Sequence, residues 1–246
     1  MKLIKIKNLT KNYHTKAKEI QAIDNISFDI NDSEIVSIIG PSGCGKSTLL
    51  NILTDLDKPS SGTIEKKDNL KIGYMMQNDC LLPWLTVIDN ATLGLKLKSI
   101  KNEENIEYVN TLLDRYGLKE FANDYPKNLS GGMRQRLALI RTLAIKPDIL
   151  FLDEPFSKLD YTTRLSISDD VFKIIKELNI SAILITHDVK EATMLSNRII
   201  VLSKRPAIIK EIITLPEDDN IPSKKERLTN YDEIINSIWE LIKDDL

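Results

Sequence analysis

The sequence contains few cysteines and no long apolar run. Its two cysteines, Cys44 and Cys80, form neither a disulfide framework nor a Cys-x-x-Cys pair, so the chain suits a reducing cytoplasm. No apolar stretch approaches the roughly 18 residues that a transmembrane helix needs. Residues 1–7 alternate apolar and basic side chains, which is typical of a strand and not of a signal peptide. If the protein works at a membrane, we expect another chain to hold it there.

An excess of positive charge is also missing. The 34 Lys and Arg residues are balanced by 36 Asp and Glu residues, which gives a net charge of -2. A nucleic-acid-binding surface usually needs a basic patch, so we expect no nucleic acid partner. The 246 residues are 42% hydrophobic and 28% charged, which is ordinary for a globular protein of one large or two smaller domains.

A glycine-rich stretch at residues 40–48, GPSGCGKST, matches the phosphate-loop pattern G-x-x-x-x-G-K-[ST]. The apolar run before it is typical of a buried strand, and the residues after it are typical of a helix. The glycines let successive backbone N–H groups point into one hollow, where the helix N-terminus adds partial positive charge. Lys46 would reach the β- and γ-phosphates, and Ser47 would bind Mg²⁺. The predicted contacts to a nucleoside triphosphate are Gly40, Pro41, Ser42, Gly43, Cys44, Gly45, Lys46, Ser47 and Thr48.

The cysteine inside this loop is a second point of chemical interest. A thiol at a helix N-terminus is often acidified and reactive. We therefore expect Cys44 to be reactive and to be shielded by bound nucleotide, with Cys80 shielded less.

Two acidic residues, Asp153 and Glu154, follow the apolar run ILFL at residues 149–152. A strand that ends in an aspartate places that carboxylate at the carboxyl edge of the sheet, beside the phosphate loop, where it can bind Mg²⁺. Glu154, one residue further on, can polarise the water that attacks the γ-phosphate. The alternative is a solvated pair of acids at a strand end, and this motif alone does not decide between the two.

Strand-like and helix-like segments alternate along the chain, which predicts a mainly parallel α/β sheet covered by helices. The expected strands are 2–9, 26–30, 35–39, 63–65, 71–76, 149–152, 180–186, 199–202 and 208–213, with a loop at 11–19. The expected helices are 48–53, 86–98, 103–116, 133–145, 161–178, 188–196 and 231–243. Residues 215–227 read as a charged linker. The last helix should carry Ile235, Ile238, Trp239 and Ile242 on one face.

A third motif, LSGGMRQR at residues 129–136, lies between the phosphate loop and the acidic pair. In this order the three motifs resemble those of the ATP-binding cassette (ABC) ATPases, over nearly the full length of the chain. The resemblance implies an α/β P-loop NTPase (RecA-like) core with an N-terminal antiparallel β subdomain and an inserted helical subdomain at about 78–135. It divides the chain into an ABC ATPase domain, residues 1–214, and a C-terminal linker with an amphipathic helix, residues 215–246.

Four single residues stand where this family has functional ones, although each is a weak signal alone. The resemblance implies that Tyr13 stacks on adenine and that Gln77 is the glutamine of a switch loop, where it binds Mg²⁺ or water. It places Asp160 at the end of the D-loop and His187 at the switch histidine, which contacts the γ-phosphate. The D-loop is usually Ser-Ala-Leu-Asp in this family, whereas this chain has Lys158 in place of the alanine; we expect that side chain to point to solvent.

The resemblance also implies a mechanism in which two copies pair head to tail around ATP. The signature residues of one copy, Leu129, Ser130, Gly131, Gly132 and Gln135, would face the phosphate loop of the other. Ser130 precedes a helix, so its hydroxyl and the free N–H groups suit a γ-phosphate. Glu154 would be the general base, with Lys46 and His187 assisting. The Mg²⁺ ligands would be Ser47, Gln77 and Asp153.

The stretch LLPWLTVIDN at residues 81–90 is similar to the importer branch for nitrate, sulfonate and taurine, whose related members carry pyrimidine vitamin precursors. This implies a peripheral subunit at the cytoplasmic face of the membrane, working with a permease and indirectly with a solute-binding protein. Leu82, Pro83 and Trp84 would dock the permease, unless they form local core. Alternatives are an ATPase of an exporter or lipoprotein-release system and a non-transport ABC ATPase. A plain P-loop kinase would lack LSGGMRQR.

Overall fold

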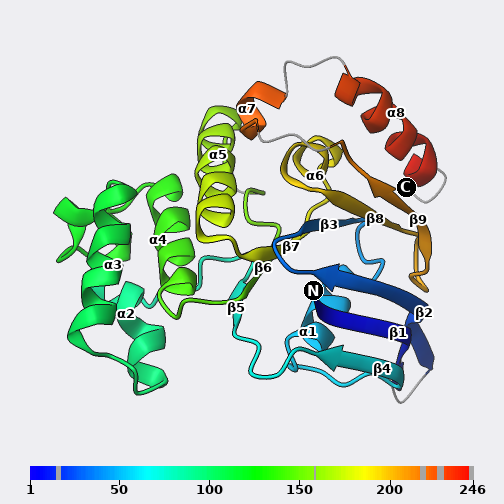
Figure 1. The fold of residues 1–246 in the computed structure, drawn as a ribbon, viewed down its shortest axis with the longest axis horizontal. Coiled ribbons are helices and arrows are strands. Elements are labelled where there is room, and N and C mark those ends of the chain that lie inside the picture. Colours follow the sequence, from blue (N-terminus) through cyan, green and yellow to red (C-terminus); the bar gives the residue numbers. More distant parts are fainter. Residues whose placement is uncertain (15–17, 158, 217–219, 226–229, 244–246) are drawn as a thin grey trace.

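The computed structural model describes residues 1–14, 18–157, 159–216, 220–225 and 230–243. Two sheets form the body of the molecule (Figure 1). The smaller sheet lies at one end, and a lobe of helices lies at the other. The larger sheet stands between them and carries the loops that build the site.

The smaller sheet is antiparallel, with the strand order β2-β1-β4. Its strands are β1 (Lys2–His14), β2 (Glu19–Asn31) and β4 (Ser61–Lys66). β1 runs further than expected, because its polar second half still pairs with β2, with Lys11 opposite Ile23 and Tyr13 opposite Ile20. The expected loop is therefore wrong for residues 11–14, and residues 15–17 lie outside the described part of the chain.

The larger sheet has the order β5-β6-β7-β3-β8-β9 and is parallel except for its last strand. β3, β6 and β7 are buried at every position, which explains their continuous apolar sequences. The strands are β3 (Ile35–Ile39), β5 (Ile72–Met75), β6 (Ile149–Asp153), β7 (Ser181–Ile185), β8 (Arg198–Leu202) and β9 (Ile209–Thr214). The helices that follow its strands are α1 (Lys46–Leu53), α5 (Tyr161–Leu178) and α6 (Val189–Leu195). The predicted parallel α/β sheet is confirmed.

The helical lobe is inserted between β5 and β6 (Figure 1). It contains α2 (Val87–Leu97), α3 (Glu103–Arg115) and α4 (Gly131–Leu143), with short 3-10 turns at Lys119–Phe121 and Pro126–Asn128. Thr86 caps α2 by accepting a hydrogen bond from the backbone N–H of Asp89, as its sequence predicts. α4 begins two residues earlier than expected, because the Ser130 hydroxyl caps it by accepting from the Met133 N–H.

The C-terminal segment packs on the outer side of α5 and α6. Its elements are α7 (Pro222–Lys225) and α8 (Asn230–Ile242). The expected linker thus contains a short helix. The carboxylate of Asp169, on α5, holds this helix by accepting hydrogen bonds from the Ser223 N–H at 2.9 Å and from the Ser223 hydroxyl at 2.6 Å. Ile235, Ile238 and Ile242 are buried, whereas Trp239, at the edge of the same face, is 44% exposed. Within the described ranges, the structure contains no helix of the length and apolarity needed to span a bilayer.

Candidate nucleotide-binding site

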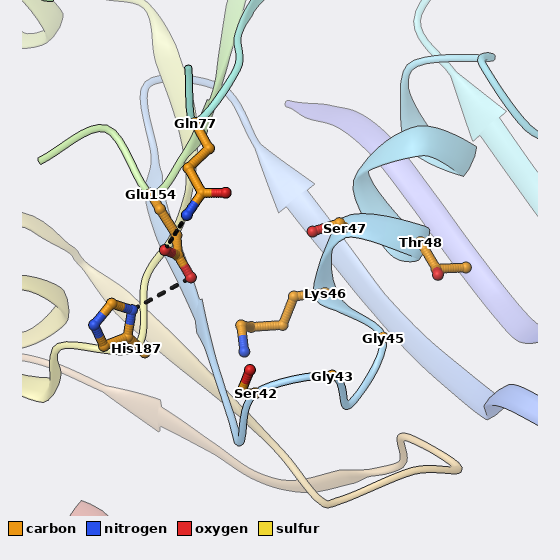
Figure 2. A pocket seen from close by; sticks show the side chains of 9 residues that line it. All are labelled: Ser42, Gly43, Gly45, Lys46, Ser47, Thr48, Gln77, Glu154 and His187. Atoms are coloured by element: carbon orange, nitrogen blue, oxygen red, sulfur yellow. Dashed lines mark hydrogen bonds and ion pairs between the residues drawn. The ribbon is translucent and has the colours of Figure 1, made fainter. Parts of the chain in front are cut away.

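A cavity of about 520 Å³ opens at the carboxyl edge of the larger sheet (Figure 2). Its walls come from the loop between β3 and α1 and from residues just after β5, β6 and β7. Ligands of open α/β sheets bind at this edge. The lining residues are Ser42, Gly43, Gly45, Lys46, Ser47, Thr48, Gln77, Glu154 and His187. Sequence motifs more than 100 residues apart therefore meet in one place.

The phosphate loop is held in shape by its backbone. Gly45 has a φ of 130°, and a Cβ there would lie 2.9 Å from the carbonyl oxygen of Ala22. Only glycine fits both constraints. As the N-cap of α1, Gly45 provides no side-chain hydrogen bond, so the first N–H groups of the helix suit an anion. The loop thus has the form of a phosphate cradle.

Lys46 is buried in this cradle. Its ammonium donates hydrogen bonds to the carbonyl oxygens of Gly40 at 2.7 Å and Pro41 at 2.9 Å. Both acceptors are neutral, so the positive charge favours an anionic group in the cavity. The side chain lies beside Ser42 (Figure 2). A triphosphate fits this donor set.

Cys44 does not behave as expected. Its side chain is only 1% exposed and packs into the apolar core beneath the loop. Burial raises the pKa of the Cys44 thiol, more than the nearby Lys46 lowers it. The expectation of an acidified, reactive thiol is therefore wrong, whereas Cys80 is exposed. Gly40, Pro41 and Cys44 support the loop from behind and do not line the cavity.

Asp153 ends β6 and is largely buried. Burial raises the pKa of its carboxyl group, and the neighbouring charge of Glu154 raises it further, while a hydrogen bond with Tyr74 and the charge of Lys46 lower it. An additional cation would stabilise the ionised form. The described residues contain no group of three or more His, Cys, Asp and Glu suited to a metal. Mg²⁺ usually takes one or two protein ligands together with phosphate oxygens and water. A site with the Asp153 carboxylate as a ligand therefore fits this ion.

Glu154 lies between two polar side chains from neighbouring loops (Figure 2). Gln77 Nε2 donates a hydrogen bond to Oε2 of Glu154 at 2.8 Å, and His187 Nδ1 lies 3.3 Å from Oε1. The backbone of Glu154 is left-handed, with a φ of 44°, and its N–H donates to the carbonyl of Ile185. Such a conformation in a non-glycine residue is typical of functional sites. The carboxylate faces the phosphate loop across the cavity.

Tyr13 lies beside this cavity and does not line it. Its hydroxyl donates to Asp57 at 2.8 Å, and its ring lies under the ammonium of Lys11, 4.7 Å from the ring centroid. Partial burial raises the pKa of Tyr13, and a hydrogen bond with Thr48, which does line the cavity, opposes this. Lys11 and Asp57 were not anticipated, because their meeting with Tyr13 depends on strand register.

The signature residues lie away from the phosphate loop within one chain. Gly131 and Gln135 line a second cavity of about 320 Å³ with residues 78–80, Arg134 and Leu159. Leu129 is buried, and the side-chain amide of Gln135 donates to the carbonyl of Pro155. Gly132 approaches α5 closely, since a Cβ there would lie 2.9 Å from Thr163. One copy therefore does not bring the signature motif to the phosphate loop.

Asp160 is the N-cap of α5 and accepts from the Thr163 N–H at 3.0 Å. Hydrogen bonds from Thr163, by its side chain and its N–H, and from the Thr162 hydroxyl hold the pKa of the Asp160 carboxyl well below the usual range. The residue thus has a local structural role on the surface, besides its expected place in a D-loop. Lys158 lies outside the described residues.

Two arginines of α4 hold the loop that follows Gln77, and the sequence did not indicate their role. Arg134 forms an ion pair with Asp79 at 3.2 Å. Arg141 donates to the carbonyl oxygens of Asp79 at 2.5 Å and Cys80 at 2.7 Å. Their spacing of seven residues puts both on one face of the helix, and this spacing is the sequence feature that could have predicted a shared contact. The signature helix and the loop after Gln77 are therefore mechanically joined.

The ABC transporter family matches residues 23–157, more than half of the chain. An uncharacterized ABC transporter ATP-binding protein of Bacillus subtilis, YtlC, is 39% identical over 98% of this chain and 95% of its own length. The nitrate import ATP-binding protein NrtD of Synechocystis is 38% identical over 90% of this chain and 86% of its own. The aliphatic sulfonates import ATP-binding protein SsuB of Bacillus cereus is 37% identical, covering 96% and 94%.

The solved structures show the same fold. A dimeric post-hydrolysis state of the ATP-binding cassette MJ0796, bound to ADP and Pi, superposes with a TM-score of 0.76. It is 34% identical and covers 88% of this chain and 100% of the cassette. Taken with the phosphate cradle and the cavity it lines, these likenesses show that the chain belongs to the ABC transporter family, as one of its ATP-binding and ATP-hydrolysing subunits.

Proposed function

We propose that this protein powers the uptake of a small solute through a separate membrane permease. The observation that carries the proposal is the Glu154 carboxylate, which Gln77 and His187 hold across the cavity from the phosphate loop. This arrangement suits hydrolysis of a γ-phosphate. Two of the relatives described above are import proteins, which supports the direction of transport.

The residues around the cavity divide the work of hydrolysis. Lys46 binds the phosphate oxygens, and the loop N–H groups orient them. Ser47, Gln77 and Asp153 would hold Mg²⁺, which offsets negative charge on the phosphates when bound. Glu154 accepts the proton of the attacking water, and His187 steadies that water and the γ-phosphate. Thr48 and Tyr13 provide the adenine side of the site.

We propose that the working form is a head-to-tail pair of copies. Ser130, Gly131 and Gly132 of one copy would complete the cavity of the other, because a single chain separates them from its own phosphate loop. The dimeric state of the similar cassette supports this arrangement. ATP would then join the two copies, and loss of the γ-phosphate contacts would release them.

The permease contact is proposed at Leu82, Pro83 and Trp84. The loop is rigid, because the buried side chain of Asn90 accepts from the Leu82 N–H at 2.8 Å and donates to the carbonyls of Leu82 and Leu85. Leu81 packs against the helical core, whereas Trp84 is 70% exposed. An exposed tryptophan on a rigid loop suits an interface anchor. The peripheral, cytoplasmic-face location follows from such a partner.

The solute is proposed to be of the nitrate, sulfonate or taurine type, or a vitamin precursor, and the test is an uptake experiment. Cells that lack this subunit should lose uptake of one labelled solute from this set, and the intact gene should restore it. Restoration by the Glu154→Gln variant would contradict an ATP-driven role. Loss of efflux with normal uptake would support the exporter alternative instead.

A further inference from the structure

A buried acid lies behind the loop that carries His187. Glu191, on α6, is only 8% exposed. Its Oε2 accepts a hydrogen bond from the Thr186 hydroxyl at 2.6 Å. The same hydroxyl accepts from the backbone N–H of Asp188 at 3.0 Å. Thr186 therefore ties together the residues on both sides of His187.

Asp188 fixes the far side of this loop to two helices. Its Oδ1 accepts from the N–H groups of Lys190 and Glu191, at 2.9 and 3.2 Å, and thereby caps α6. Its Oδ2 accepts from Nη1 of Arg164, on α5, at 3.0 Å. Arg164 lies one turn after Asp160, so the loop of His187 is linked to the start of α5.

Packing alone does not hold this loop. A cavity of about 220 Å³ lies beside the hydrogen-bonded groups, between α5, α6 and Pro222. Atoms that face a cavity lack the close contacts that fix a packed side chain. The side chain of His187 is itself 62% exposed, with Glu154 as a partner. The orientation of the ring therefore depends on the backbone that carries it.

We propose that Glu191, acting through the Thr186 hydroxyl, is a positioning residue that holds the imidazole of His187 against Glu154. The inference rests on the proposed function only for its effect on hydrolysis. The placement of the ring is a separate property, which can be measured without ATP.

The test uses the fact that the chain has two histidines, His14 and His187, so its imidazole NMR spectrum has two sets of signals. Thr186→Val removes the hydroxyl and keeps the shape of the side chain, and we expect it to shift and broaden the His187 signals while those of His14 stay unchanged. Thr186→Ser retains the hydroxyl and should give a spectrum close to that of the original protein. A His14→Gln variant assigns the two sets.

Thr193→Val is the matched control. Thr193 is also fully buried and lies on α6, but its hydroxyl donates to the carbonyl of Val189 in the same helix. This variant should leave the His187 signals in place. Unchanged His187 signals in a folded Thr186→Val protein would overturn the proposal.

Glu191→Leu tests the same link from its other end and keeps the proposal falsifiable if Thr186→Val does not fold. It should move the His187 signals as Thr186→Val does, whereas Glu191→Gln, which keeps an acceptor for the hydroxyl, should move them less. Signals that stay in place in folded Glu191→Leu would equally refute the link.

Hydrolysis gives the second readout. We expect kcat to fall about 10-fold in Thr186→Val and Glu191→Leu, with KM for ATP within about twofold, because His187 acts on the γ-phosphate late in the reaction. If the His187 signals move but kcat does not, the positioning link is supported and the proposed role of His187 in hydrolysis fails. A large rise in KM with normal kcat would contradict positioning for catalysis.

Discussion

The two walls of the nucleotide cavity are built in different ways. The phosphate-loop wall is held by backbone geometry, with Gly45 in a conformation only glycine adopts easily and Lys46 tied to two carbonyls. The opposite wall is formed by the side chains of Gln77, Glu154 and His187 from three separate loops, and Gln77 and His187 each contact Glu154. The first wall is ready to bind phosphate, whereas the second places a carboxylate across the cavity from it. We expect substitutions in the two walls to separate binding from hydrolysis.

The largest effect is expected from Lys46→Ala in the phosphate-loop wall. The variant loses the charge that binds the phosphates, so ATP hydrolysis should fall by at least about 100-fold, and ATP binding should weaken with it. Turnover and nucleotide binding of the purified protein measure both. Lys98→Ala, which changes an exposed lysine in the helical lobe, is the control. Normal turnover in Lys46→Ala would overturn the assignment of this wall.

Glu154→Gln should separate ATP binding, the role of the first wall, from hydrolysis, the role of the second, most cleanly. It keeps the shape of the side chain but removes the base, so hydrolysis should fall about 100-fold or more while ATP still binds. An ATP-bound dimer should accumulate and elute early in size-exclusion chromatography with Mg-ATP. If only monomer elutes although ATP is bound, the head-to-tail arrangement is wrong.

A smaller effect is expected away from the cavity, at the proposed permease contact. Trp84→Ala removes an exposed side chain, so turnover and melting temperature of the free subunit should stay nearly unchanged, while permease binding should weaken by about 10-fold. Leu81→Ala is the matched comparison. Leu81 packs against the core, and its loss should lower the free energy of unfolding by about 1–2 kcal/mol. A strongly destabilised Trp84→Ala protein with normal permease binding would show that Trp84 belongs to the core.

A further effect concerns pH and the support behind the second wall. The pKa of Glu191 is raised from 4.5 to about 7, because burial and the charge of Asp188 raise it more than the Thr186 hydrogen bond, Arg164 and His187 lower it. The folded state then binds more protons than the unfolded state between these pH values, so this group lowers stability as pH rises from about 4.5 to 7. Glu191→Gln removes the effect. Its stability relative to the original protein should be roughly 1–3 kcal/mol more favourable at pH 8 than at pH 4.5. Chemical denaturation at both pH values measures this, and an equal difference at both would refute the raised pKa.

The elements that position the site could be predicted because their signals are local. The phosphate loop, the strand before Asp153 and the cap at Thr86 each depend on residues adjacent in sequence. The meeting of Gln77, Glu154 and His187 was expected only from the family resemblance, and in the structure it results from parallel strands that end at one edge. Such predictions are reliable because the residues that form the element are the same residues whose sequence pattern indicates it.

The features that escaped prediction depend on contacts between distant segments. Lys11 meets Tyr13 and Asp57 only because β1 keeps pairing with β2 beyond residue 9. The Cys44 side chain points inward because of the shape of the loop and the core beneath it, and no periodic pattern in the sequence predicts this orientation.

The separation of the signature motif from the phosphate loop within one chain has a consequence for how the protein is assayed. In the proposed head-to-tail pair, a single copy would hold two unlike halves of a site and no whole one, so two copies would carry two complete sites and an isolated copy none. The rate per molecule would then become a function of dilution, rising with protein concentration until all copies are paired. A specific activity quoted without the enzyme concentration would describe the fraction of paired copies as much as the chemistry.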